Sequence, residues 1–267
     1  VAVGAFRHED SADVAARDGA GGGFRLLAWS LSPLHHDLGS IDGQEALGLQ
    51  PGDLDGVGIA RFRARRGDDA SCLNLYAPRE PTVLAATPSF VRERRFSFQS
   101  SLAQTEEERA NPWLLLESER EPGGAIPVVA DAGTLAYALH RKLGDEMSLG
   151  ATGTRVRFVA ALAPGLRQGQ LVMGDGHFLQ AFSGETGYRF FLFDVPGEKA
   201  NPLATRLESR LSDFGLDVGE AAARLRHVGE RTLLGADDLV VLVPLSGDQH
   251  NVGRIGRDDG ALDRART

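Results

Sequence analysis

The strongest strand signal in this chain is YRFFLFDV at residues 188–195. Four apolar residues run consecutively from Phe190 to Phe193, and Gly187 and Pro196 bracket the stretch. A short apolar run that is rich in aromatic residues and bounded by turn residues is typical of a buried strand. The stretch therefore predicts a buried strand.

The residues that follow this strand predict a helix and a return strand. Leu203, Leu207 and Leu211 recur at i, i+4 and i+8, which places them on one face of a helix over residues 201–214. Gly215 is suited to ending that helix, and an apolar stretch resumes at residues 216–218. The strand, helix and strand together favour a βαβ or split βαβ unit.

Further strands are expected on the N-terminal side. Residues 24–34 show two apolar faces, and Pro33 is expected to close that strand. Residues 57–65 alternate between small or apolar residues and Arg61, Arg63 and Arg65, so they predict a half-exposed strand. Apolar runs predict more strands at residues 82–86, 113–117, 126–130 and 171–173.

The middle of the chain mixes short helices with a hairpin. Asp131 is a good N-cap for a helix that would bury Leu135, Leu139 and Leu143 and end at Gly144. Ala151, Thr152 and Gly153 predict the turn of a hairpin between residues 147–149 and 155–162. The remaining expected helices or exposed segments lie at residues 88–94, 100–111, 176–182 and 221–228.

Composition excludes several classes of protein. The net charge of -8 disfavours a nucleic-acid partner, because phosphates are negative too. A single cysteine, Cys72, rules out a disulfide within the chain and a CxxC metal site. No run of about 18 apolar residues occurs, and the longest candidate, residues 239–245, is too short to span a bilayer.

Candidate catalytic and metal-binding motifs are weak. His35, His36 and Asp37 are adjacent, and neighbouring residues on a strand point to opposite faces, so they predict a solvated loop rather than a metal site. Cys72 follows Asp68 and Asp69, which disfavour a thiolate, so we expect a packed structural cysteine. No phosphate-binding loop or nucleophile elbow is present, so the sequence predicts no catalytic, cofactor or metal site.

Five stretches resemble the outer domain of ABC-transporter permeases of the MacB/FtsX type. The resemblance covers roughly residues 1–228, in order and without large gaps. The stretches are DDASCLNLYAPREPTVLA (68–85), NPWLLLE (111–117), IPVVADAGTLAYALHRKLGD (126–145), VRFVAALAPGLRQGQLVM (156–173) and GYRFFLFDVP (187–196).

The resemblance implies an α+β fold with a discontinuous α/β subdomain and an inserted, mostly β subdomain. The implied boundaries are a flexible lead-in at 1–23, a membrane-proximal subdomain at 24–100 and 187–228, and the inserted subdomain at 101–186. The polar breaks at 105–110 and 183–187 support a separate core for the inserted part. Residues 229–267 depart from the family pattern and are expected to be a diverged C-terminal tail.

The resemblance also implies a non-enzymatic role on the extracytoplasmic face of a bacterial membrane. There the domain would couple a transport cycle to substrates or partners. Implied partners are an ABC ATPase, a second permease copy, and an extracytoplasmic protein or lipid-linked substrate, with no cofactor. The alternatives are a stand-alone soluble solute-binding or adaptor-like protein derived from such a domain, and an enzyme with dispersed catalytic residues. The candidate interaction residues are Cys72, Asn74, Tyr76, Asn111 and Trp113.

Overall fold

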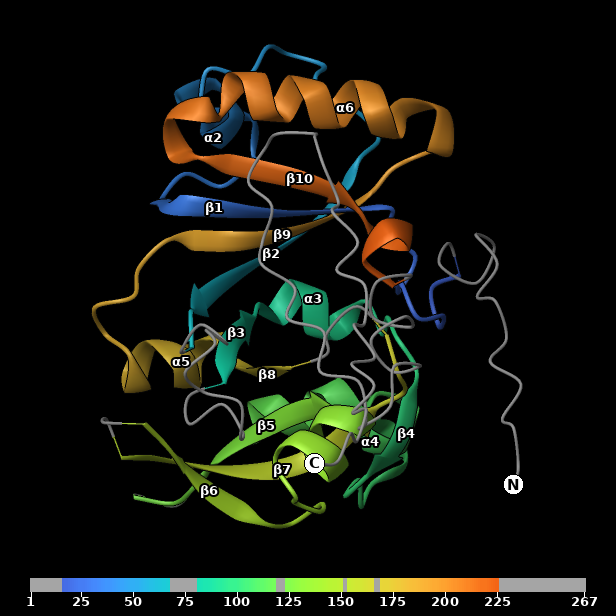
Figure 1. Ribbon diagram of the computed structural model, residues 1–267, viewed down its shortest axis with the longest axis vertical. Helices are drawn as coiled ribbons and strands as arrows, with labels where there is room; N and C mark the ends of the chain where they lie inside the picture. Colours follow the sequence, from blue (N-terminus) through green and yellow to red (C-terminus); the bar gives the residue numbers. More distant parts are fainter. Residues whose placement is uncertain (1–15, 68–80, 119–122, 151–152, 166–168, 226–267) are drawn as a thin grey trace, which may run out of the picture. The chain divides into compact units, whose positions relative to one another are not determined.

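A computed structural model of the chain describes residues 16–67, 81–118, 123–150, 153–165 and 169–225. They form a mixed α/β fold with one ten-stranded sheet, as the α+β expectation required (Figure 1). The strands run in the order β10-β1-β9-β2-β3-β8-β5-β7-β4, and β6 pairs with β7. Their bounds are β1 (Leu26–Leu34), β2 (Gly58–Arg65), β3 (Thr82–Ala86), β4 (Phe98–Ser101), β5 (Ile126–Asp131), β6 (Glu146–Leu149), β7 (Thr154–Leu162), β8 (Gln170–Gly174), β9 (Tyr188–Asp194) and β10 (Leu216–Glu220).

Helices cover both faces of this sheet. In Figure 1, α6 and α2 lie at the end of β10 and β1, whereas β5, β6 and β7 lie at the opposite end. Their bounds are α2 (Ile41–Ala46), α3 (Pro88–Arg92), α4 (Glu106–Ala110), η1 (Pro112–Glu117), η2 (Thr134–Ala138), α5 (Asp175–Ala181), α6 (Gly197–Arg210) and η3 (Ser212–Phe214). A short helical stretch also begins at Ala221.

Strand β9 is buried, as its sequence predicts, and the structure places it between two other strands with both of its faces covered. It pairs antiparallel with β1 on one side and with β2 on the other. Phe190 and Leu192 pack into one hydrophobic cluster, and Phe191 and Phe193 pack into another on the opposite face. The unbroken apolar run therefore reflects two covered faces.

The unit that follows β9 is a split βαβ. Strands β9 and β10 both pair antiparallel with β1, so they run parallel to each other with β1 between them. Helix α6 begins at Gly197, earlier than predicted, and Pro202 lies inside it. The buried Leu203 and Leu207 face the sheet, and Gly215 in the left-handed region (φ 60°) leads into β10.

We divide the sheet into two blocks. The first block holds β10, β1, β9 and β2, and the second block holds β3, β8, β5, β7, β4 and β6. One sheet face carries a shared cluster, which draws side chains from both blocks. The opposite face carries a first-block cluster under α6 and α2 and a second-block cluster that includes residues of η2 and α5.

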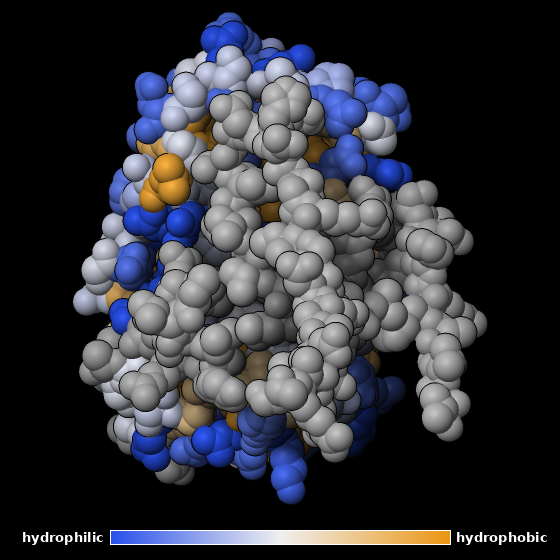
Figure 2. All heavy atoms as spheres, in the orientation of Figure 1, coloured by the Kyte–Doolittle hydropathy of each residue, from blue (hydrophilic) through white to orange (hydrophobic). Residues whose placement is uncertain are grey.

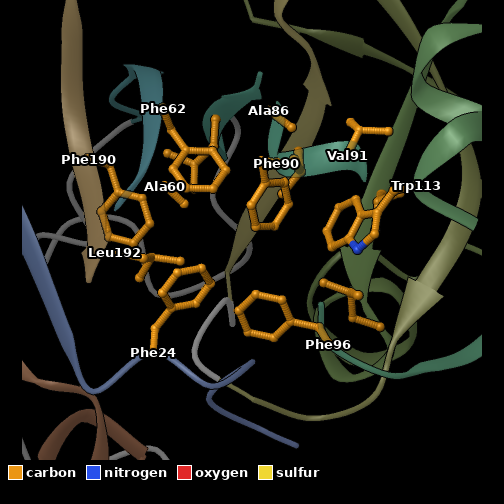
Figure 3. Packing of buried hydrophobic residues seen from close by; sticks show 14 of the residues in the cluster. Phe24, Ala60, Phe62, Ala86, Phe90, Val91, Phe96, Trp113, Phe190 and Leu192 are labelled. Atoms are coloured by element: carbon orange, nitrogen blue, oxygen red, sulfur yellow. The ribbon is translucent and has the colours of Figure 1, made fainter. Parts of the chain in front are cut away.

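Aromatic rings connect the two blocks within the shared cluster (Figure 3). Phe62 of β2 packs edge-on against Phe90 of α3, with ring centroids 4.9 Å apart, and contacts Phe190 of β9 at 5.5 Å. Phe90 in turn packs edge-on against Trp113 of η1 at 5.1 Å. Such tilted pairs add to the stabilisation that comes from burying the rings.

The shared cluster corrects the expectation of a separate core for the inserted part. Trp113, Val129 and Val172 of the second block lie in the same cluster as Phe190 and Leu192. Strand β3 pairs with β8, and β4 pairs with β7, so both strands join the second block. The paired residues lie 59 to 88 positions apart in the sequence, so local breaks in polarity could not reveal these pairings. The assignment of subdomains in a membrane-bound protein stays a prediction.

Two predicted local structures in the second block are wrong. Residues 112–117 form a 3-10 helix, not a strand, since Pro112 suits a first helical turn and the turn buries Trp113, Leu115 and Leu116 together. The helix after Asp131 is a π-helix that ends at Ala138 rather than at Leu143. It ends there because His140 adopts a positive φ of 51°.

The N-terminal lead-in is packed where it is described. The backbone N–H of Phe96 donates to the carbonyl of Arg17 at 2.8 Å, and residues 21–24 are buried. Gly22 has a positive φ of 61°, and a Cβ there would lie only 2.5 Å from the Phe96 ring. The glycine run therefore allows close packing rather than flexibility. Pro33 likewise lies inside β1 instead of closing it.

The described surface is mostly polar. Figure 2 shows hydrophobic colour on this face only in small separate areas among hydrophilic residues. The large hydrophobic side chains that are exposed are Leu31, Ile41 and Tyr137. Within the described ranges, we find no helix with the length and hydropathy needed to cross a bilayer.

Candidate functional site

The candidate interaction residues fall into two groups. Cys72, Asn74 and Tyr76 lie outside the described residues, so their roles stay predictions. Asn111 and Trp113 are buried, with 3% and 0% of their surface exposed.

Both buried side chains serve the interior. The Asn111 amide Nδ2 donates to the carbonyl of Val91 at 2.9 Å. The Trp113 indole Nε1 donates to the carbonyl of Arg95 at 2.7 Å. Both side chains are buried in this structure, and their role as interaction residues stays a prediction. The motif NPWLLLE supplies core contacts and backbone hydrogen bonds.

The structure instead reveals an arginine seam on β2. We define the seam as Arg61, Arg63 and Arg65, together with the side chains that contact them: Asp37, Asp175, Phe182 and Tyr188. Alternate residues of a strand face opposite sides of the sheet, and Ala60, Phe62 and Ala64 enter the shared cluster. The arginines therefore lie on the opposite face, between the first-block and second-block clusters.

Arg61 is held by groups of the first block. Its Nη2 lies 2.7 Å from the Asp37 carboxylate, and its guanidinium lies 5.3 Å from the centre of the Tyr188 ring. Asp37 also accepts the backbone N–H of Gly39, so both oxygens of its carboxylate have a partner. The buried Nε of Arg61 has no hydrogen-bond partner among the described residues.

Arg63 and Arg65 connect β2 to α5 of the second block. The Arg63 Nε lies 2.9 Å from Asp175, with both side chains more than four-fifths buried, and its guanidinium lies 4.7 Å from the Tyr188 ring centre. The Arg65 guanidinium lies 4.9 Å from the ring centre of Phe182, just after α5. The Asp175 carboxylate and the Phe182 ring thus bind guanidinium groups across the boundary between the blocks, whereas Tyr188 contacts Arg63 from β9 within the first block.

The chemistry of the seam suits orientation rather than catalysis. Arginine stays protonated at physiological pH, so these groups supply fixed charge and directional donors rather than a proton. Sequence reasoning identified the alternation but assigned the arginines to a solvent-exposed face. Asp175 is 112 residues from Arg63, so no local pattern could indicate the pairing.

A second charged junction surrounds Arg95, whose side chain is 3% exposed. Its guanidinium binds Asp194 at 2.7 Å, Glu93 at 2.6 Å and the carbonyl of Gly22 at 3.1 Å. It also lies 4.2 Å from the centre of the Phe24 ring. The junction therefore joins the lead-in to the end of β9.

The backbone on both sides of Arg95 is strained. Arg94 and Phe96 have positive φ values of 53° and 65°, a region that side-chain-bearing residues rarely adopt.

Burial of the Arg95 side chain needs the carboxylate and carbonyl partners described above, because an unpaired buried charge is costly. No local pattern marks Arg95 as buried, because the charged residues Arg92, Glu93 and Arg94 directly precede it in the sequence.

Other candidate chemistry is sparse in the described part of the chain. There, no group of three or more His, Cys, Asp or Glu side chains is placed to hold a metal ion. A shallow cavity of about 220 Å³ is lined mainly by glycines and small residues, with Arg155 as the ionisable side chain among them. The Arg155 guanidinium donates to the carbonyl of Gly123 at 2.5 Å.

One exposed carboxylate has a shifted pKa. The pKa of Glu108 is lowered, first because its carboxylate accepts the backbone N–H of Thr105 and next because it accepts that of Gln104. Thr105 and Glu108 form a capping box at the start of α4. This shift belongs to a helix cap and not to a reactive group.

Comparisons with known proteins give structural matches alone. No protein-family model and no curated protein sequence matches the chain. The fold is similar to the periplasmic region of MacB from Actinobacillus actinomycetemcomitans, with a TM-score of 0.39 and 10% identity over 80% of this chain and 95% of that one.

Two further structures belong to the same kind of protein. The extracellular domain of the ABC-type transporter YknZ from Gram-positive bacteria matches with a TM-score of 0.35 and 13% identity, over 73% of this chain and 98% of that one. A domain of a putative permease from Porphyromonas gingivalis matches with a TM-score of 0.31 and 10% identity, over 74% and 87%.

Proposed function

We propose that this chain is the extracytoplasmic domain of an ABC-transporter permease, and that it couples the transport cycle to substrates or partner proteins. The observation that carries the proposal is the way the chain builds its first block. Strands β1 and β2 come before the second block in sequence, and β9 and β10 come after it, yet the four pair side by side. The chain therefore enters the sheet through the first block and also leaves the sheet through the first block.

This arrangement suits a domain that receives movement from both of its ends. The lead-in is fixed to the core through Gly22 and Arg95, and Arg95 also binds Asp194 at the end of β9. Movement of the entering segment would therefore reach β9 directly. Rigid-body movement of packed elements is a common way to transmit such a signal.

The contacts between the blocks would carry the movement onward. The shared cluster holds the blocks together on one sheet face, and the Arg63–Asp175 pair joins them on the other. A movement of the first block would then change the position of a ligand or partner that is bound to the second block. The implied partners are an ABC ATPase, reached through a membrane part, and a second permease copy. An extracytoplasmic protein or lipid-linked substrate would bind outside the membrane, where the domain would lie.

The decisive experiment uses the complete natural reading frame that contains this chain. We expect it to encode membrane-spanning segments on both sides of the domain, and the purified protein to retain an ABC ATPase. A cysteine-free background with Lys199→Cys on exposed α6 should react with a membrane-impermeant thiol reagent added outside intact cells.

Three results would contradict the proposal. A complete product without membrane segments would favour the stand-alone solute-binding or adaptor-like protein. Labelling of Lys199→Cys only after the cells are opened would place the domain in the cytoplasm. An unchanged ATPase rate when the domain is deleted from the complex would also remove the coupling role.

A further inference from the structure

The second block presents an exposed aromatic and basic surface at the turn between β5 and β6. We call it the basic tip and define it as Tyr137, Arg141, Lys142 and Arg157. Tyr137 is 82% exposed, the highest value among the exposed large hydrophobic side chains of the described residues. The three basic side chains are exposed as well. The ring and the three basic side chains are therefore all accessible to a partner in solution.

The backbone beneath the basic tip is held firmly. The buried Asp131 carboxylate accepts the backbone N–H of Thr134 at 2.9 Å and also the Thr134 hydroxyl. The same hydroxyl oxygen accepts the backbone N–H of Gly169 at 2.7 Å. The N–H of Arg141 donates to the carbonyl of Leu135 at 2.9 Å, which closes the turn. Tyr137 and Arg141 are thus presented from a fixed frame.

The conformation of this turn is unusual in two respects. Tyr137 lies in a π-helix, a form that is rare and often marks functional sites. His140 has a positive φ of 51°, which directs the chain back toward β6. Gly144 then donates to the carbonyl of Phe158 at 2.8 Å, and β6 pairs Glu146 with Arg157. Arg157 therefore belongs to the same end of the block as the turn.

The segment that carries the basic tip, residues 137–157, has a positive net charge, whereas the chain as a whole has a negative one. Residues 137–157 contain four arginines or lysines and two acidic residues, Asp145 and Glu146, in a chain with a net charge of -8. The Asp145 carboxylate accepts the backbone N–H of Lys142, and Glu146 lies 3.5 Å from Arg155. Both acidic groups are therefore engaged within the segment, whereas no contact of the Arg141, Lys142 or Arg157 side chains is seen among the described residues.

We propose that the basic tip is a docking surface for an acidic segment of another extracytoplasmic protein; this deepens the proposed function and rests on it for the location of the partner. Tyrosine supplies contact area with little loss of conformational entropy, and arginine binds carboxylates with two parallel hydrogen bonds. These residue types are enriched at binding hot spots. An acidic segment with an apolar residue complements both features.

A membrane surface and a second copy fit less well. Binding to anionic lipid needs a dense group of basic residues, roughly four to eight, whereas the tip has three beside two acidic groups. The remainder of the chain is acidic and would be repelled by anionic headgroups and by other copies of itself. A short acidic segment contacts the basic tip without covering the acidic remainder of the chain, so it meets less of this repulsion.

The test measures binding of a defined peptide to the full 267-residue chain. The probe is a fluorescent 14-residue peptide of alternating glutamate and tyrosine, followed by fluorescence anisotropy. The reference probe has glutamine in place of every glutamate. We expect the acidic peptide to bind more tightly than the reference, with an affinity that falls as salt is added.

Three variants identify the surface. Tyr137→Ala and Arg141→Glu should each weaken binding about tenfold, as expected for hot-spot residues. Lys199→Glu on the exposed part of α6 makes the same change in net charge and should alter binding less than about twofold, because only the general field changes. Thermal unfolding of each variant should match the unaltered chain, since these side chains lie in solvent.

Several outcomes would overturn the proposal. Equal binding of both peptides, or equal losses for Arg141→Glu and Lys199→Glu, would show that no specific surface exists. Binding to phosphatidylserine vesicles that Tyr137→Ala abolishes would assign the tip to a membrane. Self-association in sedimentation velocity that Arg141→Glu abolishes would assign it to a second copy. Association with the ATPase is measured separately from peptide binding. Loss of peptide binding therefore leaves the proposed function standing, and loss of ATPase association leaves the peptide-binding result standing.

Discussion

The two faces of the sheet join the blocks in different ways. On one face, Phe62, Phe90, Trp113 and Phe190 form a continuous apolar layer across both blocks. On the other, the arginine seam separates the first-block cluster from the second-block cluster. Apolar burial is strong but non-directional, whereas paired charges are directional and contribute less net stability. The shared cluster would therefore supply cohesion, and the seam would set the relative orientation of the blocks.

The largest expected effect comes from removing a ring of the shared cluster. Phe62 is fully buried, and Phe62→Ala should lower the free energy of unfolding by about 3–5 kcal/mol. Because the cluster is shared, urea unfolding followed by circular dichroism should remain a single transition at a lower midpoint. A transition in two separate steps would show that the blocks have independent cores and would restore the sequence-based division.

The seam should respond less, and its response should depend on both partners. Arg63→Met and Asp175→Asn should each cost about 1–3 kcal/mol, since each leaves a largely buried charged group without its partner. The double variant should cost less than the sum of the two, which a double-mutant cycle measures.

A matched pair on the surface is the control for this cycle. Arg155 and Glu146 lie 3.5 Å apart, with both side chains about half exposed, and should show a coupling of about 0.2–1 kcal/mol at most. A coupling in the seam no larger than this would reduce Arg63 and Asp175 to an ordinary surface ion pair. The proposed orienting role would then have no energetic basis.

Tyr188 tests the aromatic part of the seam alone. Tyr188→Leu keeps an apolar side chain but removes the ring that faces Arg61 and Arg63, so it should cost about 1 kcal/mol. Tyr137→Leu, at a solvent-exposed position, should change stability by less than about 0.5 kcal/mol. Equal effects of the two substitutions on the denaturation midpoint would argue against a specific guanidinium–ring contact.

The smallest expected effect lies outside both faces, in the capping box of α4. The pKa of Glu108 is lowered in the folded chain because the backbone N–H of Thr105 donates to its carboxylate. Its stabilising contribution is therefore present above the ordinary pKa of glutamate and is lost as the pH falls through the lower folded-state value. Glu108→Gln should reduce the difference in stability between neutral and acidic solution slightly. An unchanged pH dependence would show that the cap is open in solution.

Much of the strand and helix pattern follows from sequence alone. The run at Phe190–Phe193 predicts a buried strand, and the leucines at 203 and 207 predict the buried face of α6. These signals are local: residues within one element carry the full pattern of burial. The hairpin of β6 and β7 follows in the same way from its turn residues.

The candidate sites could not be predicted in this way, because their partners are distant in sequence. Asp175 meets Arg63 and Asp194 meets Arg95 only after β2, β9 and the second block are paired into one sheet. Local polarity indicated a division of the chain, yet strand pairing placed β3 and β4 with β8 and β7 and fused the cores. The sequence thus determined which residues form strands and which faces are apolar. Only the tertiary structure decided which charges meet, since hydrogen bonds and ion pairs act over a few ångströms between segments that sequence separates by a hundred residues.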